Sequence, residues 1–331
     1  MTNRRTFLKE AAVCSGALAF AANTAGAADW KRQVGLELYT VRDLTAKDYE
    51  GTVAKVAEIG YKEVEAATDY ANLEPKQFRA MLDRYGLTMP STHVGATAGP
   101  GLEKQLEGFQ IMGIRYTEIR GGGGRGGAGG PAAPPAAPLA VPGAVPGAAP
   151  GGARGPGPGG NAQTEESVKR TAGQLNQNGK VAKKFGMKML FHNHTMEFQP
   201  LEGGKLRPYD ILLAETDPAL VAMQLDVGWA SVAGQDILEM FKKNPGRFEL
   251  WHVKDAKGIK TMNAQMTQQE RQRSAMLVPV GLGEVDYKPI LAAAGLAGLK
   301  HYCIEQDNAA DGGDSVAAAR QSYQNLVKML G

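Results

Sequence analysis

The chain has 331 residues and a formal net charge of +3, from 37 Lys and Arg against 34 Asp and Glu. This near-neutral balance excludes the strongly basic surface with which proteins bind nucleic acid or anionic membranes. The length suffices for one large barrel or for two modest domains.

Residues 1–27 are predicted to be a twin-arginine signal peptide. Arg4-Arg5 precede an apolar stretch at 11–22, and Ala25-Gly26-Ala27 has the small-x-small pattern of a cleavage site. The apolar stretch is too short and too rich in Ala and Gly for a stable membrane span, and Cys14 lacks the context of a lipid anchor. We therefore expect an exported mature protein, residues 28–331, that resides in the periplasm without a membrane anchor.

Removal of the predicted signal peptide leaves a protein with a net charge close to zero and a single thiol. Lys and Arg fall from 37 to 34 and Asp and Glu from 34 to 33, so the net charge becomes +1. Cys303 is then the one remaining cysteine, and no internal disulfide can form. Stability must come from the packed core.

Beyond the signal peptide, strand patterns alternate with helical patterns. Strands are predicted at 34–38, 63–66, 88–92, 116–119, 189–194, 223–226, 248–253 and 301–305, and helices at 49–59, 75–85, 102–112, 165–185, 209–215, 236–243, 287–294 and 315–329. Four helices are followed directly by glycine, at Gly60, Gly86, Gly113 and Gly186. Eight such units predict an α/β protein with one (β/α)8 TIM barrel. A doubly wound sheet is the alternative, but no glycine-rich phosphate loop follows the first strand.

Two segments interrupt this alternation. Residues 121–160 are almost wholly Gly, Ala and Pro, and we expect a loop there that contributes nothing to the core. Residues 257–276 are polar and rich in Gln and Met, and they are expected to form a short helical excursion over one face.

Polar residues gather at the predicted carboxyl ends of the strands. In a TIM barrel this is where functional side chains lie, because the strand interiors fill the core. In chain order these residues are Glu37, Tyr39, Glu63, Glu65, His93, Glu118, Arg120, His192, Asn193, His194, Glu197, Asp226, Trp229, His252, Lys254, Asp255, Glu305 and Asp307. Four of the five histidines belong to this set. The fifth, His301, begins the last strand at the opposite face, where we expect a structural role.

Three of these residues, Asp226, His252 and Glu305, indicate a metal site. Any one of them can equally cap a strand or pair with a neighbour. Buried together without a cation, they would leave like charges uncompensated. Carboxylate oxygen combined with imidazole nitrogen suits Mn²⁺, Co²⁺, Fe²⁺ or Zn²⁺ better than Ca²⁺.

Six short blocks resemble the xylose isomerase-like family of sugar phosphate isomerases and epimerases. They lie at 35–42, 191–198, 225–229, 251–255, 280–286 and 304–307, in the family's order and spacing. The resemblance covers nearly all of residues 28–331 except the Gly/Ala/Pro segment. It implies a TIM barrel, a small sugar substrate and one divalent metal ion, with Mn²⁺ as first choice and Co²⁺, Fe²⁺, Zn²⁺ and Mg²⁺ also compatible.

The resemblance also implies a ligand set, with one departure. In the ketose 3-epimerase branch the metal is held by Glu, Asp, His and Glu from four strand ends, and Asp226, His252 and Glu305 match the last three. At the first position this chain has His192, followed by Asn193 and His194. Side chains alternate along a strand, so both histidines can face inward. We expect His192 to be the fourth ligand and keep His194 as the alternative.

These residues together predict a metal-dependent sugar isomerase or epimerase. The ion polarises a carbonyl, and Glu305 or Glu197 removes the neighbouring proton to give an enediolate. Lys254 is the third predicted catalytic residue, and the predicted substrate contacts are Glu37, Tyr39, His93, Glu118, Arg120, His194 and Trp229. Two alternatives stay open: a lyase acting on a keto-glycoside, which suits the predicted export, and a non-catalytic sugar-binding barrel, which the missing strand-five Glu suggests. Export favours an unphosphorylated sugar or keto-glycoside, and the sequence leaves a homo-oligomer open.

Overall fold

The computed structural model describes residues 30–121, 163–311 and 313–331. The predicted signal peptide lies outside the described residues, as does the predicted loop at 121–160 apart from Gly121. Both stay predictions, together with the assignment of residues 28–331 to a single domain.

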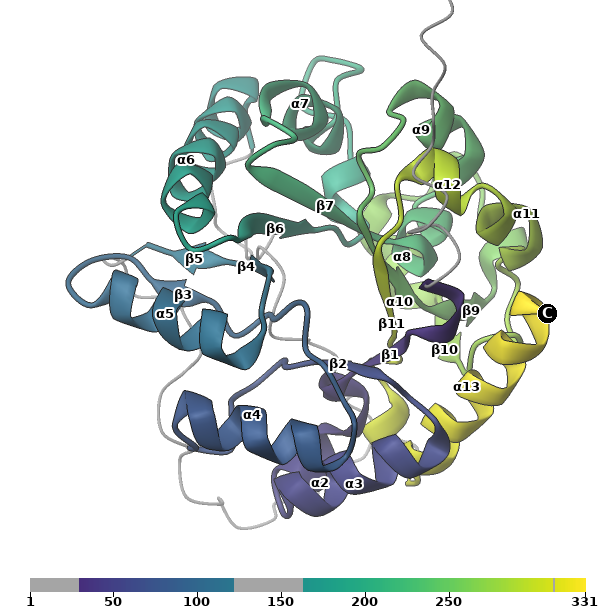
Figure 1. Cartoon of the computed structure of the whole chain (residues 1–331). Helices are drawn as coiled ribbons and strands as arrows, with labels where there is room; N and C mark the ends of the chain where they lie inside the picture. The colour runs from purple at the N-terminus through teal and green to yellow at the C-terminus, as the bar shows by residue number, and fades with distance from the viewer. Residues whose placement is uncertain (1–29, 122–162, 312) are drawn as a thin grey trace, which may run out of the picture.

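A ring of parallel strands forms the centre of the protein (Figure 1). Its strands are β1 (Val34–Glu37), β2 (Glu63–Glu65), β4 (Tyr116–Thr117), β6 (Lys188–His192), β7 (Val221–Asp226), β8 (Leu250–Val253) and β11 (His301–Ile304). They form one sheet in the order β2-β1-β11-β8-β7-β6-β4, with parallel pairing throughout. Residues 88–92 supply the eighth strand, because isolated parallel bridges join them to β2 on one side and to β4 on the other.

Helices surround this ring (Figure 1). They are α2 (Arg42–Thr45), α3 (Tyr49–Ile59), α4 (Pro75–Arg84), α5 (Leu102–Met112), α6 (Glu165–Lys183), α7 (Pro208–Glu215), α8 (Val227–Val232), α9 (Ile237–Lys243), α10 (Gln268–Ser274), α11 (Tyr287–Ala292), α12 (Ala294–Ala297) and α13 (Ser315–Leu330). Short 3-10 turns are η1 (Trp30–Arg32), η2 (Leu38–Val41), η3 (Met196–Phe198), η4 (Ile259–Thr261) and η5 (Ala309–Asp311). Eight parallel strands enclosed by helices confirm the predicted (β/α)8 barrel.

Local sequence signals explain where the helices begin and end. The side chain of Asp48 accepts a hydrogen bond from the backbone N–H of Gly51 and so caps α3, and Thr164 forms a capping box with Ser167 at the start of α6. The four glycines predicted to follow helices all have positive φ, for example 88° at Gly113. The predicted helices are therefore confirmed, with bounds that differ by at most two residues.

Two predicted strands are wrong at their carboxyl ends. The strand predicted at 116–119 divides, because residues after β4 turn outward as β5 (Ile119–Arg120) to pair with β3 (Ala96–Thr97). The strand predicted at 189–194 ends at His192, because the side chain of Asn193 binds the backbone of Asp226 in place of a ladder partner.

The segment at 257–276 contains the predicted excursion but is more ordered than predicted. It includes η4 and α10, and it is flanked by an antiparallel pair of β9 (Asp255–Lys257) and β10 (Met276–Val278). A hydrogen bond of 2.8 Å joins Gln272 of α10 to Thr195, which follows β6. The excursion therefore lies beside the carboxyl ends of the strands.

The amino-terminal end of the barrel holds a polar cluster of its own. His301 Nδ1 lies 2.9 Å from Glu63 Oε1, and Arg115 donates to His301 Nε2 at 2.9 Å. Glu249 accepts from Lys188, from Lys300 at 2.8 Å and from the Tyr116 hydroxyl at 3.0 Å. His301 therefore lies at the end predicted from the sequence, away from the other four histidines. Glu63 was expected at a carboxyl end, but it is the first residue of β2 and lies at this amino-terminal end as well.

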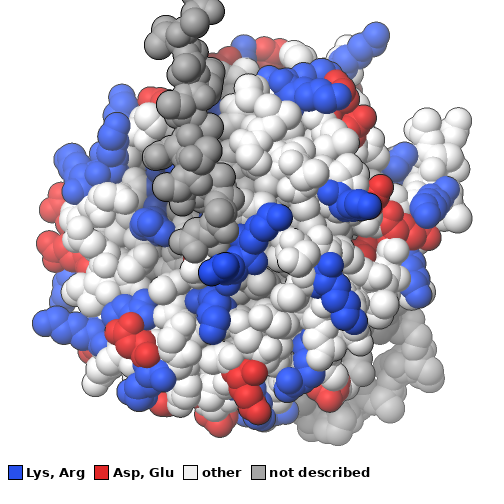
Figure 2. Space-filling model, turned by 45° about the vertical axis from the view of Figure 1, so that its right-hand side comes forward, with Lys and Arg blue, Asp and Glu red and all other residues white. Residues whose placement is uncertain are grey.

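The exterior carries charges of both signs. On the face shown in Figure 2, Lys and Arg side chains are interspersed with Asp and Glu among wide neutral areas. That face thus has no continuous basic surface of the kind that nucleic acid needs. Within the described ranges, no helix combines the length and apolar composition needed to cross a bilayer.

Candidate metal centre

The barrel interior changes from apolar to polar along the strands. Near the amino-terminal end, the inward side chains Tyr116, Leu190, Ala222 and Leu250 form a small apolar cluster. Because inward positions recur every second residue, the next layer on β6, β7 and β8 consists of His192, Gln224 and His252. One layer further lie Asp226 and Lys254. The interior at the carboxyl-terminal end of the strands, called the mouth of the barrel below, is therefore lined by groups that bind protons or cations.

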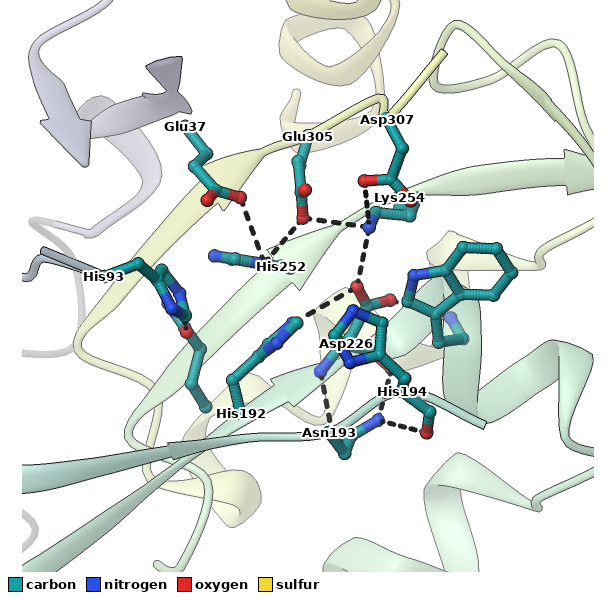
Figure 3. A network of polar contacts seen from close by, with 12 residues as sticks. Glu37, His93, His192, Asn193, His194, Asp226, His252, Lys254, Glu305 and Asp307 are labelled. Atoms are coloured by element: carbon teal, nitrogen blue, oxygen red, sulfur yellow. Dashed lines mark hydrogen bonds and ion pairs between the residues drawn. The ribbon is translucent and has the colours of Figure 1, made fainter. Parts of the chain in front are cut away.

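The four predicted metal ligands meet in this polar layer (Figure 3). One ligand atom from each of His192, Asp226, His252 and Glu305 lies within 4.8 Å of the corresponding atoms of the other three. His252 Nδ1 is 2.8 Å from Glu305 Oε2, and His192 Nε2 is 3.4 Å from Asp226 Oδ2. Strand register explains the meeting, because Asp226 stands beside His252 in the β7–β8 pair.

The same four residues fit a divalent cation because each has a buried polar atom that makes no hydrogen bond of good geometry to the described residues. His192 Nε2, Asp226 Oδ2, His252 Nδ1 and Glu305 Oε2 are all buried and have no hydrogen-bond partner of good geometry among the described residues. Buried polar atoms are rarely left so. Glu37 and Glu65 are also buried beside them, so four buried carboxyl groups gather here, and the buried ammonium there contacts only two of them, Asp226 and Glu305. A cation would relieve this excess of acidic groups.

That ammonium belongs to Lys254, which is fully buried. Its Nζ lies 3.1 Å from Asp226 Oδ2, 2.9 Å from Glu305 Oε2 and 2.8 Å from Asp307 Oδ1. Burial alone would lower the pKa of Lys254, but the three carboxylates outweigh burial and raise that pKa well above its ordinary value. Lys254 is therefore a fixed internal cation, in contact with two of the predicted ligands.

The two candidates for the first ligand occupy different places. His192 belongs to the converging set, whereas His194 lies beyond the end of β6, with its ring centroid 4.9 Å from that of His192. Asn193 between them is buried: its Oδ1 accepts from the backbone N–H of Asp226 at 3.1 Å. The geometry thus brings His192 to the other ligands and His194 to the rim, 6.4 Å from the Trp229 ring.

The remaining predicted catalytic and aromatic residues line the same mouth. Glu197 is buried in η3, where its Oε2 accepts from the His194 N–H at 2.7 Å, and burial raises the pKa of its carboxyl group. Lys254 Nζ lies 5.1 Å from the centroid of the Trp229 ring, and the Arg42 guanidinium lies 4.2 Å from that of Tyr39. Both rings already stack with a cation of the protein.

The other predicted substrate contacts are Glu37, His93, Glu118 and Arg120. Glu37 Oε2 is 3.6 Å from His252 Nδ1, which brings Glu37 close to the proposed ligands. His93 has both ring nitrogens engaged, Nε2 with Gln224 Oε1 at 2.8 Å and Nδ1 with Glu118 Oε1 at 3.3 Å. Arg120 donates to the carbonyl of His93 at 2.6 Å. Sugar contacts by these residues stay predictions.

Three polar residues in the cluster had no role predicted from the sequence, although two of them, Glu65 and Asp307, belong to the strand-end set. Glu65 Oε2 lies 2.6 Å from His252 Nε2, Gln224 bonds Glu65, and Asp307 bonds Lys254. Glu65 and Asp307 stand at strand ends, as the other site residues do. Gln224 precedes Asp226 by two positions and so shares its face of β7, which was the available signal.

Comparisons with known proteins find curated relatives over part of the chain. No family model matches the chain. An inosose dehydratase of Geobacillus thermodenitrificans is 29% identical over 153 residues, 44% of this chain and 50% of that protein. An inosose dehydratase of Clostridium perfringens is 34% identical over 131 residues, 38% of this chain and 42% of that protein. The chain thus spans half or less of the length of these curated relatives.

Solved structures extend the likeness over the whole fold. A sugar phosphate isomerase/epimerase from Parabacteroides distasonis superposes with a TM-score of 0.60 at 18% identity, covering 91% of this chain and 96% of that one. A xylose isomerase-like TIM barrel protein from Mycobacterium smegmatis, in complex with magnesium, gives 0.56 at 14% identity, covering 92% and 98%. At these identities the likeness establishes the fold alone, a (β/α)8 TIM barrel.

Proposed function

We propose that this protein is an enzyme that removes a proton next to the carbonyl of a sugar or a sugar-like ketone. The carrying observation is the set of four buried ligand atoms, from His192, Asp226, His252 and Glu305, within 4.8 Å of one another. A divalent ion bound there would act as a Lewis acid on the substrate carbonyl. Mn²⁺ is the first choice for this mixture of imidazole and carboxylate, and Mg²⁺, Co²⁺, Fe²⁺ and Zn²⁺ are the others to test.

The residues around this set supply the proton chemistry of the proposal. Glu305 and Glu197 are the two candidate bases, because both carboxylates are buried near the mouth of the barrel. Lys254 is the nearest fixed cation, and its ammonium would stabilise negative charge that develops on the substrate oxygen. Asp226, His252 and Lys254 are fully buried, and charges interact more strongly in such surroundings than in water.

The fate of the resulting enediolate separates two candidate reactions. Loss of the hydroxyl group on the next carbon, as water after it takes up a proton, is an elimination. Two observations favour elimination: the curated relatives are named inosose dehydratases, and β6 ends in an imidazole, so the site lacks a carboxylate on that strand for a symmetrical two-base exchange. Reprotonation, which gives an isomer or epimer, is the second candidate and is supported by the names of structural neighbours.

One experiment tests the shared step and separates the two fates. The chain loaded with Mn²⁺ is incubated in D2O with ketoses, keto-glycosides and cyclic polyol ketones, and NMR follows deuterium at the carbon next to the carbonyl and identifies products. We expect exchange on at least one substrate class, with an unsaturated product for elimination. Bound metal with neither exchange nor product across the panel would favour the sugar-binding barrel instead.

Metal content tests the ligand assignment separately. Asp226→Ala and His252→Ala should each lower bound Mn²⁺ sharply, measured by elemental analysis after dialysis, since each removes one of four ligands. Asp210→Ala, a change at a carboxylate that pairs with Arg207, is the matched control and should retain the ion. Full metal occupancy in either ligand variant would refute the assignment.

The proposed substrate class also depends on the predicted export. A periplasmic enzyme meets unphosphorylated sugars and glycosides, so we propose substrates without a phosphate group. The corresponding sugar phosphates are added to the panel as a comparison. We expect turnover of the free sugars or keto-glycosides and no turnover of the sugar phosphates.

A further inference from the structure

His252 makes a short contact on each side of its ring. Nδ1 faces the proposed ligands, 2.8 Å from Glu305 Oε2, and Nε2 faces the opposite way, 2.6 Å from Glu65 Oε2. A neutral imidazole that ligates through Nδ1 must carry its hydrogen on Nε2. Glu65 is the acceptor for that hydrogen, and metal-bound histidines typically donate their other N–H to such a group.

Glu65 is itself held in one orientation. Both of its oxygens accept from Gln224 Nε2, at 3.0 Å each, and the side chain is fully buried at the end of β2. Gln224 cannot be turned over, because its Oε1 accepts from His93 Nε2 at 2.8 Å and its amide must face the carboxylate. His93 in turn is 3.3 Å from Glu118.

We propose that Glu65, held by Gln224, is the positioning residue that directs Nδ1 of His252 toward the metal ion. The inference rests on the proposed function, since it needs a metal at the four-residue set. Glu65 touches no substrate in this scheme. It acts through His252 by fixing the ring plane and the position of its hydrogen.

A second ion is the competing interpretation of the same residues. Ligand atoms of Glu37, Glu65, His93 and His252 also lie within 4.8 Å of one another. In contrast to the first set, Glu65 and His93 already use their polar atoms in hydrogen bonds to Gln224. These bonds favour positioning, and the number of ions bound per chain decides between the two.

The test compares Glu65→Gln with a matched control on the same strand. Glu63→Gln alters a carboxylate that also contacts a histidine, His301, at 2.9 Å, but at the other end of the barrel. Calorimetric titration of the metal-free chain with Mn²⁺ gives affinity and stoichiometry, and the visible absorption of the Co²⁺ form gives ligand geometry. We expect one ion per chain, a Kd about 10–100-fold weaker in Glu65→Gln with an altered Co²⁺ spectrum, and wild-type values in Glu63→Gln.

Each other result has a definite meaning. An unchanged Kd and spectrum in Glu65→Gln, beside normal binding by the wild type, would overturn this inference alone. Two ions in the wild type and one in the variant would replace it with a second metal site. A wild type that binds no divalent ion would overturn the proposed function as well. Should Glu65→Gln fail to fold, Gln224→Met, which keeps the carboxylate but releases it, must weaken binding for the inference to stand.

Discussion

Lys254 is expected to contribute both to the stability of the protein and to the proposed reaction. Its ammonium lies within 3.1 Å of carboxylate oxygens of Asp226, Glu305 and Asp307, in a fully buried position. Buried carboxylates without a counter-charge are costly, so the ion-free protein depends on this cation. The bound ion and Lys254 would share the same two carboxylates, and each therefore compensates in part for the loss of the other.

The variant Lys254→Met separates these two contributions. We expect the melting temperature of the metal-free protein to fall, since the buried carboxylates of Asp226 and Glu305 and the half-buried one of Asp307 lose their ammonium, and we expect saturating Mn²⁺ to restore much of it. Turnover of the metal-loaded variant should fall by about 10²-fold or more, because the oxyanion loses its cation. Calorimetry and steady-state kinetics measure the two effects. Lys242→Met, at an exposed ion pair with Glu239, should change neither; full turnover in Lys254→Met would remove Lys254 from the mechanism.

Among the structural elements, the loop that follows β10 is fixed by a single carboxylate. Asp255, at the start of β9, is buried and accepts from the backbone N–H groups of Gly281, Gly283 and Val285 at 2.9, 3.0 and 3.1 Å. Charge-assisted bonds of this kind are stronger than neutral ones. These bonds hold the loop against the segment that directly follows His252 and Lys254 in the chain.

Gly283→Ala tests how closely this loop must approach. A Cβ at residue 283 would lie 2.1 Å from Asp255 Oδ1, so the loop or the carboxylate must move. We expect a loss of about 1–3 kcal/mol in the free energy of unfolding, measured by urea denaturation. Gly173→Ala is the control: it lies exposed within α6 with open space around it and should stabilise by about 0.5–1 kcal/mol. Equal stability of Gly283→Ala and wild type would show that the close approach is unimportant.

Elements with a strong periodic pattern were predictable, and short elements defined by tertiary contacts were not. The bounds predicted for the helices at 49–59 and 102–112 agree fully with α3 and α5. In contrast, α8 begins where the Asp226 side chain accepts a hydrogen bond from the Trp229 N–H, and the β9–β10 pair joins segments that are separated by residues 258–275. Neither contact leaves a periodic trace in the chain.

The same distinction applies to the site. Strand ends predicted that His192, Asp226, His252 and Glu305 lie close together, because every parallel strand delivers its carboxyl end to one face, and their ligand atoms do lie within 4.8 Å of one another. Their role as metal ligands stays a prediction. Which of them touch depends on side-chain depth and on the pairing of neighbouring strands. For that reason Gln224, an ordinary glutamine within β7, could not be recognised as the link between Glu65 and His93.

At the scale of the whole molecule, the two ends of the barrel hold separate polar clusters. Lys188 and Lys300 pair with Glu249 at the amino-terminal end, away from the proposed metal. Burial alone would raise the pKa of Glu249, but the hydrogen bonds from the two lysines outweigh it and hold that pKa below its ordinary value of 4.5. Changes in this cluster should therefore alter stability and leave metal binding intact.

The pH dependence of unfolding checks this division. A depressed pKa in the folded state gives a stabilisation that is present above pH 4.5 and is lost as the pH falls through the folded value. We expect Glu249→Gln to melt lower than wild type at neutral pH and to lose less stability on acidification, with unchanged Mn²⁺ affinity. Glu107→Gln, at an exposed position of α5, should follow the wild-type profile. Parallel pH profiles for Glu249→Gln and wild type would contradict the assignment.

The inward parity of the strands has a further consequence for how such a chain can change in length. A single residue inserted in β6, β7 or β8 would turn His192, Asp226 or His252, respectively, from the barrel axis toward the surrounding helices. The site would then lose that ligand. In the sequence, residues 122–162 come after β5 and before α6, and so precede β6, β7 and β8. Insertion or deletion of residues at that position leaves the inward orientation of the ligands unchanged. One extra residue within β6, by contrast, would turn His192 away from the barrel axis.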